Sequence, residues 1–179
     1  SGERAALLAA TPNSSSMVVR FYIRTVLGGS TYYDYAERTM TVVNGNPVFT
    51  AAQITYQDTS APVVAITTDN QKIVQNNSDL NVTYTAATPQ KSATISSYKI
   101  TLDTNIQTKT TAQTLDYNTV NLSTDTPVTI EVTDSRGFKT TVSKTISILP
   151  WQPPRSVNAI ARVNNYEDNT KVKADVTIS

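Results

Sequence analysis

Residues 127–154, PVTIEVTDSRGFKTTVSKTISILPWQPP, decide the fold class of this chain. Val128, Ile130 and Val132 alternate with polar residues, and the alternation resumes after residue 137, which is the period of half-buried strands. Between the two runs lies Asp-Ser-Arg-Gly, in which Asp can accept bonds from its own backbone and Gly tolerates positive φ. The stretch therefore predicts a β-hairpin and a proline-stiffened exit, with the inward set of the second strand at Phe138, Thr140, Val142, Ile146 and Ile148.

The rest of the chain repeats this pattern of short strands and polar turns. A short helix is predicted over residues 3–10, and strands over residues 17–27, 32–43, 48–56, 63–67, 80–86, 95–102 and 114–122. Strands at this spacing, with no long amphipathic helix between them, predict an all-β sandwich or barrel. The expected inward residues of these strands are Val64, Ile66, Leu80, Val82, Tyr84, Tyr98, Ile100, Leu102, Leu115 and Tyr117.

Three segments are expected along the chain. Residues 46–149 are close to the ~100 residues of an immunoglobulin-like β-sandwich and are predicted as the one complete domain. Residues 1–45 are predicted as the C-terminal part of an upstream β domain with a short N-terminal helix. Residues 150–179 are predicted as a Pro-rich linker and the first strands, 157–163 and 172–178, of a downstream β domain. The Asn-Gly pair at 44–45 is also a hairpin signal, and Pro47 makes a domain boundary an equal alternative.

The composition excludes several classes of function. Fifteen basic and fourteen acidic residues give a net charge of +1 without long runs of either sign, which argues against nucleic acid as a partner. The chain has no Cys and no His, the usual zinc ligands and catalytic nucleophile–base pairs. No apolar run approaches the roughly 18 residues of a membrane span, so no membrane insertion is predicted. We expect no enzyme, no catalytic residue and no cofactor.

Three landmarks occur in a characteristic order. AATPNS at residues 9–14 precedes a strand that reaches Arg24-Thr25, SATISSY occupies residues 92–98, and VTDSRG at residues 132–137 leads to ILPW and a Pro-Pro pair. In this order they resemble the minor structural or tail appendage proteins of streptococcal and lactococcal siphophages, with Trp151 where Tyr is more usual. The resemblance implies tandem Ig-like domains in the virion tail, extracellular during host attachment. It also implies other virion tail proteins as partners, and host cell-wall polysaccharide for some members.

Two aromatic features are the candidate ligand-binding residues. Tyr32, Tyr33 and Tyr35 form the densest aromatic cluster, and exposed Tyr rings beside a carboxylate could stack on sugars and bond their hydroxyls. The favoured alternative is a strand whose Tyr residues pack on a core or on a neighbouring domain. Trp151 could be a ligand platform, but a plug at a junction between domains is the favoured interpretation.

Charged residues give weaker signals. Calcium requires six to eight oxygen ligands, and turn chemistry accounts for each acidic residue near a strand end without a metal, so no metal site is predicted. Arg136 and Lys139 at the hairpin tip, or Arg20 and Arg24 on one strand, could meet anionic wall polymers, although solvated surface charge is the more common explanation. The carboxylates considered for a metal are Asp58, Asp69, Asp103, Asp125 and Asp134.

The sequence thus predicts an all-β protein of tandem immunoglobulin-like sandwich domains, one complete and two partial. Its predicted function is a structural module of a bacteriophage tail tip or tail fibre that can contribute to host cell-wall recognition. A bacterial surface adhesin or spacer repeat and a carbohydrate-binding module remain alternatives. A homo-oligomer of the full-length protein is left open.

Overall fold

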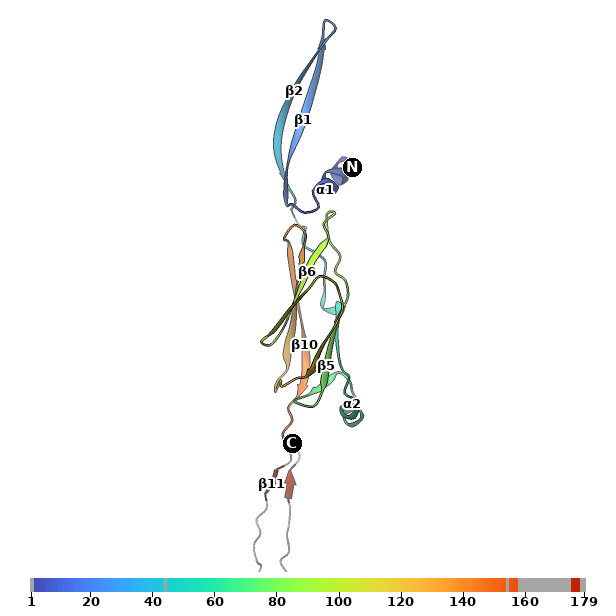
Figure 1. Ribbon diagram of the computed structural model, residues 1–179, viewed down its shortest axis with the longest axis vertical. Coiled ribbons are helices and arrows are strands. Elements are labelled where there is room, and N and C mark those ends of the chain that lie inside the picture. Colours follow the sequence, from blue (N-terminus) through green and yellow to red (C-terminus); the bar gives the residue numbers. More distant parts are fainter. Residues whose placement is uncertain (1, 44, 154, 158–174, 178–179) are drawn as a thin grey trace, which may run out of the picture.

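The computed structural model describes residues 2–43, 45–153, 155–157 and 175–177, and side chains as far as residue 153. The molecule is elongated (Figure 1). A long hairpin forms one end, a β-sandwich lies in the middle, and the short pair of β11 (Arg155–Val157) and β12 (Asp175–Thr177) lies beyond the sandwich. The protein is all-β apart from short helices, as the sequence predicts. None of the described helices has the length and hydrophobicity needed to span a membrane.

The N-terminal part consists of a short helix and one hairpin. Helix α1 (Gly2–Ala10) is followed by β1 (Ser16–Leu27) and β2 (Ser30–Thr41), which pair antiparallel along their whole length. Gly28 and Gly29 join them, both with positive φ (58° and 82°), the geometry that two-residue hairpin turns require. The predicted helix and both predicted strands are therefore confirmed.

Two sheets make up the sandwich. The larger has the order β4 (Lys72–Val74), β10 (Lys139–Leu149), β9 (Thr126–Asp134), β6 (Ile95–Leu102) and β7 (Asn105–Lys109). The smaller has the order β3 (Ile54–Asp58), β5 (Asp79–Tyr84) and β8 (Thr114–Thr119). Only β4 and β10 pair in parallel among these strands; the other pairs are antiparallel.

The predicted closing hairpin is present as β9 and β10. Its turn follows the chemistry expected from the sequence: Asp134 Oδ1 accepts the backbone N–H of Arg136 and of Phe138, both at 2.9 Å, and Gly137 has a φ of 86°. Val128, Ile130, Val132 and Ile146 are fully buried between the two sheets. The alternation of residues 127–149 therefore fixes both the register and the inward face of this hairpin.

Side chains from both sheets fill one hydrophobic core. The predicted inward residues of β5 and β6 lie in it, together with Leu115 and, from the closing hairpin, Val128, Ile130, Val132, Ile146 and Ile148. Tyr117 and Val142 are half-buried and pack against it, whereas the predicted inward residues Phe138 and Thr140 are half-buried outside this core. Phe49, Ile54 and Tyr56 complete the core from the segment before β5.

The strand predicted over residues 63–67 is wrong. Helix α2 (Ala61–Thr67) occupies that position, so Val64 is only half-buried and Ile66 is 84% exposed. Ser60 stands at the N-cap and Pro62 lies in the first turn, both positions that favour the start of a helix. Local helix-start signals thus outweigh the strand propensity of Val-Val-Ala-Ile-Thr.

Several boundaries also differ from the expectation. The segment predicted as one strand over residues 48–56 is an isolated bridge at Val48, the 3-10 turn η1 (Ala51–Gln53) and β3. The sequence does not predict β4 and β7, because β4 has only three residues and β7 (NIQTK) has a single apolar residue. The strands predicted over residues 157–163 and 172–178 overlap β11 at residue 157 and β12 at residues 175–177. Their other residues lie outside the described part of the chain.

Candidate functional site

Arg136 holds the N-terminal part of the chain to the sandwich. Its Nε–H donates to the carbonyl oxygens of Thr11 (3.0 Å) and Ser14 (3.1 Å), Nη2 donates to that of Leu8 (3.0 Å), and Nη1 to that of Gln90 (3.3 Å). The side chain is 9% exposed. The expectation of a solvated surface charge is therefore wrong for Arg136, because the loop after α1 covers the hairpin tip and supplies carbonyl partners to the guanidinium.

Ser135 adds further bonds at the same place. Its Oγ–H donates to the carbonyl oxygen of Pro12 (2.5 Å) and accepts the N–H of Thr94 (3.0 Å), while its own N–H donates to the Thr94 carbonyl (2.8 Å). The three sequence landmarks, residues 9–14, 92–98 and 132–137, thus converge on the β9–β10 turn. We call this set of contacts the Arg136 joint.

The chain that returns from the hairpin is also held against β10. Gly45 is buried so close to Phe138 that an added Cβ would lie 3.0 Å from the ring atom Cε2. The Asn46 side chain donates to the Lys139 carbonyl (2.8 Å). Thr140 Oγ1–H donates to the carbonyl of Pro47 (2.6 Å). Residues 45–47 therefore connect β2 to the sandwich rather than forming a hairpin turn, and Asn44 lies outside the described residues.

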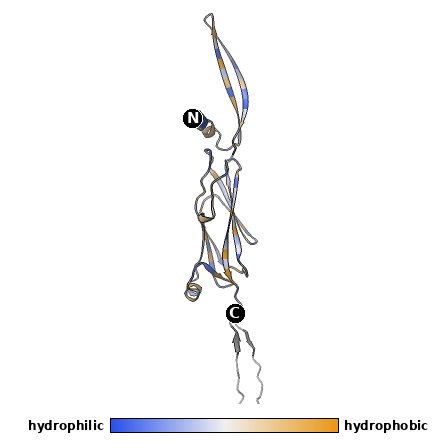
Figure 2. Ribbon diagram, turned by 180° about the vertical axis from the view of Figure 1, so that it is seen from behind, coloured by the Kyte–Doolittle hydropathy of each residue, from blue (hydrophilic) through white to orange (hydrophobic). Residues whose placement is uncertain are grey.

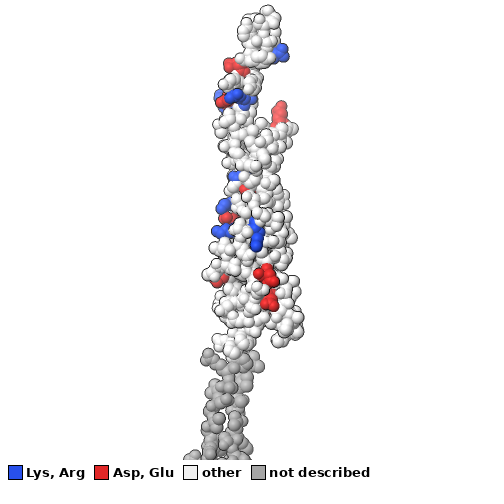
Figure 3. Space-filling model, viewed as in Figure 1, with Lys and Arg blue, Asp and Glu red and all other residues white. Residues whose placement is uncertain are grey.

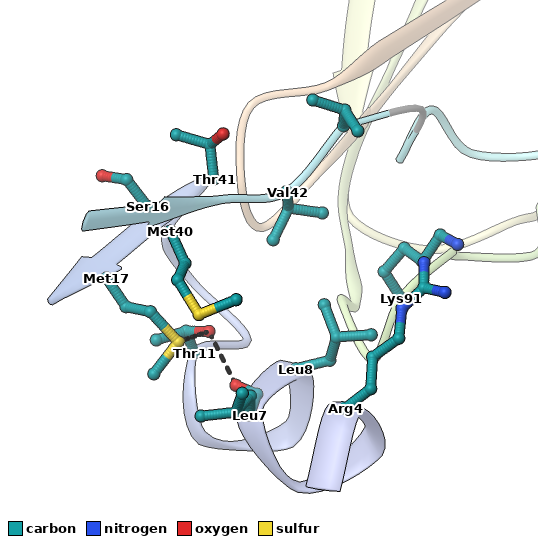
Figure 4. Close-up of a pocket in the computed structure, with 11 residues that line it drawn as sticks. Arg4, Leu7, Leu8, Thr11, Ser16, Met17, Met40, Thr41, Val42 and Lys91 are labelled. Carbon is teal, nitrogen blue, oxygen red and sulfur yellow. Dashed lines mark hydrogen bonds between the residues drawn. The ribbon is translucent and has the colours of Figure 1, made fainter. Parts of the chain in front are cut away.

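A small apolar cavity lies between α1 and the base of the hairpin. Figure 4 shows Leu7 and Leu8 from α1 facing Met17 and Met40 from the hairpin. Its volume is about 120 Å³, well below the roughly 300–1,000 Å³ of typical small-molecule pockets. We interpret it as a gap in the packing between α1 and the base of the hairpin.

The hairpin beyond the joint is exposed on both faces. The register places Tyr33 and Tyr35 on one face with Tyr22, whereas Tyr32 lies on the opposite face with Ile23. All of these side chains are 52–70% exposed. The structure therefore divides the predicted tyrosine cluster between two surfaces, and among the described residues neither a core nor a neighbouring domain buries it.

The face with Tyr22, Tyr33 and Tyr35 is polar and aromatic, and we call it the tyrosine face. The rings of Tyr22 and Tyr35 lie 5.9 Å apart, and the Arg20 guanidinium lies 4.6 Å above the Tyr35 ring. Arg20 Nε also donates to Glu37 Oε1 at 2.6 Å, and this bond raises the pKa of Arg20 above its usual value. Both partners are exposed, so this ion pair adds little to the stability of the fold, and its main effect is to hold the two side chains in place on the tyrosine face.

A second, polar groove lies beside the β6–β7 turn. It has a volume of about 250 Å³ and is lined by Asp103, Asn105, Tyr117, Asn121 and neighbouring residues. The Tyr117 hydroxyl is buried without a hydrogen-bond partner among the described residues, and burial raises its pKa. Hydroxyl and amide groups of this kind suit a polar ligand.

Trp151 lies apart from the tyrosine cluster. β10 ends at Leu149, at the end of the sandwich opposite the hairpin (Figure 1), and Trp151 follows two residues later. Trp151 is 40% exposed and donates its backbone N–H to Gln75 Oε1 (3.4 Å). The structure thus does not bring Trp151 together with Tyr32, Tyr33 or Tyr35. The predicted junction plug involves residues outside the described part of the chain.

Carboxylates considered as metal ligands accept hydrogen bonds within the sandwich. Asp58 accepts bonds from Ser60 N–H (2.8 Å) and Ser78 Oγ–H (2.6 Å), and Asp125 accepts the N–H of Ile148 (2.8 Å). In the part of the chain that the structure describes, no three acidic, His or Cys side chains gather as a metal site would need. Charged residues are sparse over the sandwich in the view of Figure 3, and those of the hairpin have both signs.

These features define a β-rich, elongated protein in which a projecting hairpin is fastened to a sandwich. A family described as "Siphovirus protein of unknown function (DUF859)" matches residues 4–179. The chain belongs to this siphovirus family, which agrees with the phage origin that the three landmarks imply. Searches among curated proteins and among solved structures returned no match.

Proposed function

We propose that the chain is a non-enzymatic structural module of a siphophage tail tip or tail appendage, located in the virion tail. The observation that carries this proposal is the Arg136 joint, which ties the base of a projecting hairpin to one end of a sandwich. A buried guanidinium bonded to four carbonyls restricts rotation between the two parts. An elongated module whose two parts are held in one orientation suits a component that keeps a fixed place along a tail and contacts other virion tail proteins.

The strand order supports an immunoglobulin-like central domain. In that fold one sheet contains strands A, B and E, and the other contains C, F and G. Here the order β3-β5-β8 matches A-B-E, and β10-β9-β6 matches G-F-C. We propose on this basis that residues 46–149 form the Ig-like unit of a tandem array, with residues 1–45 and 150–179 as parts of its neighbours.

Immunogold electron microscopy tests the tail assignment. Antibodies raised against the recombinant chain are applied to purified virions of a siphophage that encodes it, with pre-absorbed antibody as the control. We expect gold particles at the tail tip or its appendages. Label confined to the capsid, or protein found in the lysate but not in purified virions, would refute the proposal.

Recognition of host cell-wall polysaccharide is the second candidate function. The tyrosine face supports it, because three exposed rings line one surface beside Arg20, Arg24 and Glu37. Tyrosine rings stack on the apolar faces of sugars while their hydroxyls bond sugar oxygens. The ligand would be a wall polysaccharide of the streptococcal or lactococcal host that the resemblance indicates.

Binding to intact cells and to purified wall polysaccharide tests this second function. The double variant Tyr33→Ala/Tyr35→Ala should lose saturable binding, while Tyr32→Ala, which changes the opposite face, should retain it. An Asp103→Ala/Asn121→Ala variant tests the groove beside β7. Loss only in the groove variant would move the site there and favour a carbohydrate-binding module. Absence of binding in the unmodified chain would leave a spacer, a role that a bacterial surface protein could share.

A further inference from the structure

The two faces of the β1–β2 hairpin differ in composition and in what lies against them. Hydrophobic and hydrophilic residues alternate along both strands (Figure 2), so the face opposite the tyrosine face is mainly apolar. At the base of that apolar face, Leu7 and Leu8 of α1 lie against Met17 and Met40. The tyrosine face instead carries two arginines and a glutamate, all exposed, as is usual for a surface in contact with water. The tyrosine face is therefore the side of the hairpin that is open to a ligand.

Arg20 already has its partners within the protein. Its guanidinium forms the 2.6 Å ion pair with Glu37, which lies opposite it in the register. The same guanidinium lies 4.6 Å from the centre of the Tyr35 ring, which is a cation–π contact. The charge of Arg20 is thus balanced on the face itself, and one side of the Tyr35 ring is covered. This end of the tyrosine face therefore has no spare positive charge for a ligand.

Arg24 differs from Arg20, because it has no carboxylate opposite it. Its cross-strand neighbour is Tyr33, and Tyr22 lies two residues away on the same strand and face. Among the described residues Arg24 forms no salt bridge. The side chains of Tyr22 and Tyr33 are 67% and 70% exposed. Arg24 is therefore an unbalanced positive charge beside two exposed aromatic rings.

We propose that Arg24, Tyr22 and Tyr33 form a saccharide subsite that selects sugars bearing an anionic group, either a phosphodiester or a carboxylate. This inference rests on the proposed recognition of wall polysaccharide and names the chemistry of its ligand. A guanidinium donates two parallel hydrogen bonds to the oxygens of a phosphate or carboxylate. The tyrosine rings stack on the adjoining sugar and bond its hydroxyls. A neutral glycan would use the rings but gain nothing from the charge of Arg24.

Wall polysaccharide in three forms tests the proposal. One form is used as extracted, a second after hydrofluoric acid has removed its phosphodiester groups, and a third after carbodiimide and borohydride have reduced its carboxylates. Binding of the 179-residue chain to each form is measured by biolayer interferometry. We expect at least one treatment to weaken binding about 10-fold or more, as the loss of one charged hydrogen-bonded contact would. That treatment identifies the anionic group.

Variants of the arginines assign this selectivity to one side chain. Arg24→Gln should bind the extracted polymer about 10-fold or more weakly than the unmodified chain does, yet bind the anion-free form equally well. Arg24→Lys, which keeps the charge without the planar fork, should retain part of the selectivity. Arg38→Gln removes an exposed arginine from the opposite face and should change neither value. Circular dichroism verifies that each variant is folded.

The outcomes separate this inference from the proposed function. Equal binding of all three forms, or selectivity that survives Arg24→Gln, would overturn the inference while recognition of a neutral wall polysaccharide stands. Absence of binding to every form would overturn both. Added salt gives an independent check, because it should weaken binding of the unmodified chain to the extracted polymer more than binding of Arg24→Gln.

Discussion

Arg136 donates from Nε to the carbonyl oxygen of Thr11 at 3.0 Å, although the two residues are 125 positions apart in the chain. This bond joins the loop after α1 to the tip of the closing hairpin. Because the guanidinium is buried and bonded to several carbonyls at once, a single side chain controls how the projecting hairpin is attached to the sandwich. The joint is therefore the most direct place to test the mechanical role.

Arg136→Ala should release the N-terminal part while the sandwich remains folded. Each hydrogen bond from a charged donor contributes about 1.5–3 kcal/mol when its loss leaves buried groups unpaired. Since the loop can open to water, we expect local opening to become easier by about 2–4 kcal/mol. Hydrogen exchange should show loss of protection in α1 and in residue 11, with core strands unchanged.

Arg24→Ala serves as the control for Arg136→Ala, because Arg24 is an exposed arginine of the hairpin itself. Arg136→Lys should resemble Arg136→Ala, since an ammonium group cannot reproduce the planar fork that reaches four carbonyls. Equal exchange in Arg136→Ala and in the unmodified chain would show that other contacts hold the joint.

Gly45→Val should loosen the contact between residues 45–47 and the start of β10, which is the second attachment of the hairpin to the sandwich. The new Cβ would lie 3.0 Å from the Phe138 ring, a distance that forces the ring to move. Overpacking of this kind costs about 1–3 kcal/mol. Chemical denaturation of the single variants and of Gly45→Val/Phe138→Leu forms a double-mutant cycle. The smaller Leu should recover part of the loss, and strict additivity would argue against direct contact.

The sequence predicts the sandwich far better than the joint. Strict alternation in residues 127–149 identifies both strands and their inward faces, because burial on one side requires period two. The same logic fails for residues 63–67, where apolar residues occupy an exposed helix. It also misses β4, whose three residues are too few to show alternation, although Ile73 is fully buried and the strand pairs in parallel with β10.

The contacts of Arg136 could not be predicted from local sequence. Asp134 and Gly137 satisfy the turn by themselves, so nothing in the motif requires the side chain between them to be buried. Its acceptors are backbone carbonyls, which carry no sequence signature, and three of the four come from residues more than 100 positions away. The division of the tyrosine cluster between two faces, by contrast, can be predicted from the sequence, since consecutive residues of a strand point to opposite faces.

Tyr84 should make the stability of the sandwich sensitive to alkaline pH. The side chain is 1% exposed, donates to the Thr111 carbonyl (3.2 Å), and burial raises its pKa to about 12. An unfolded tyrosine ionises near pH 10. The contribution is therefore fully present below about pH 10 and is lost between about pH 10 and 12, by about 2–3 kcal/mol.

Urea unfolding at a series of pH values checks this alkaline loss. Tyr84→Phe removes the titrating group, so its free energy of unfolding should fall less steeply above about pH 10 than that of the unmodified chain. At neutral pH the variant should lose about 1 kcal/mol through the missing hydrogen bond. Parallel curves above pH 10 would assign the alkaline sensitivity to other groups, such as Tyr117.

Ile130→Asp and Thr129→Asp test the register of the closing hairpin. Ile130 is fully buried, whereas the neighbouring Thr129 points to the outer face, where its hydroxyl bonds that of Ser143 at 2.8 Å. An unpaired carboxylate in the core costs several kcal/mol, comparable to the whole stability of a domain. We therefore expect Ile130→Asp to abolish the cooperative thermal transition, and Thr129→Asp to lower stability by less than about 1 kcal/mol. Equal losses in the two variants would contradict the register and, with it, the inward face of β9.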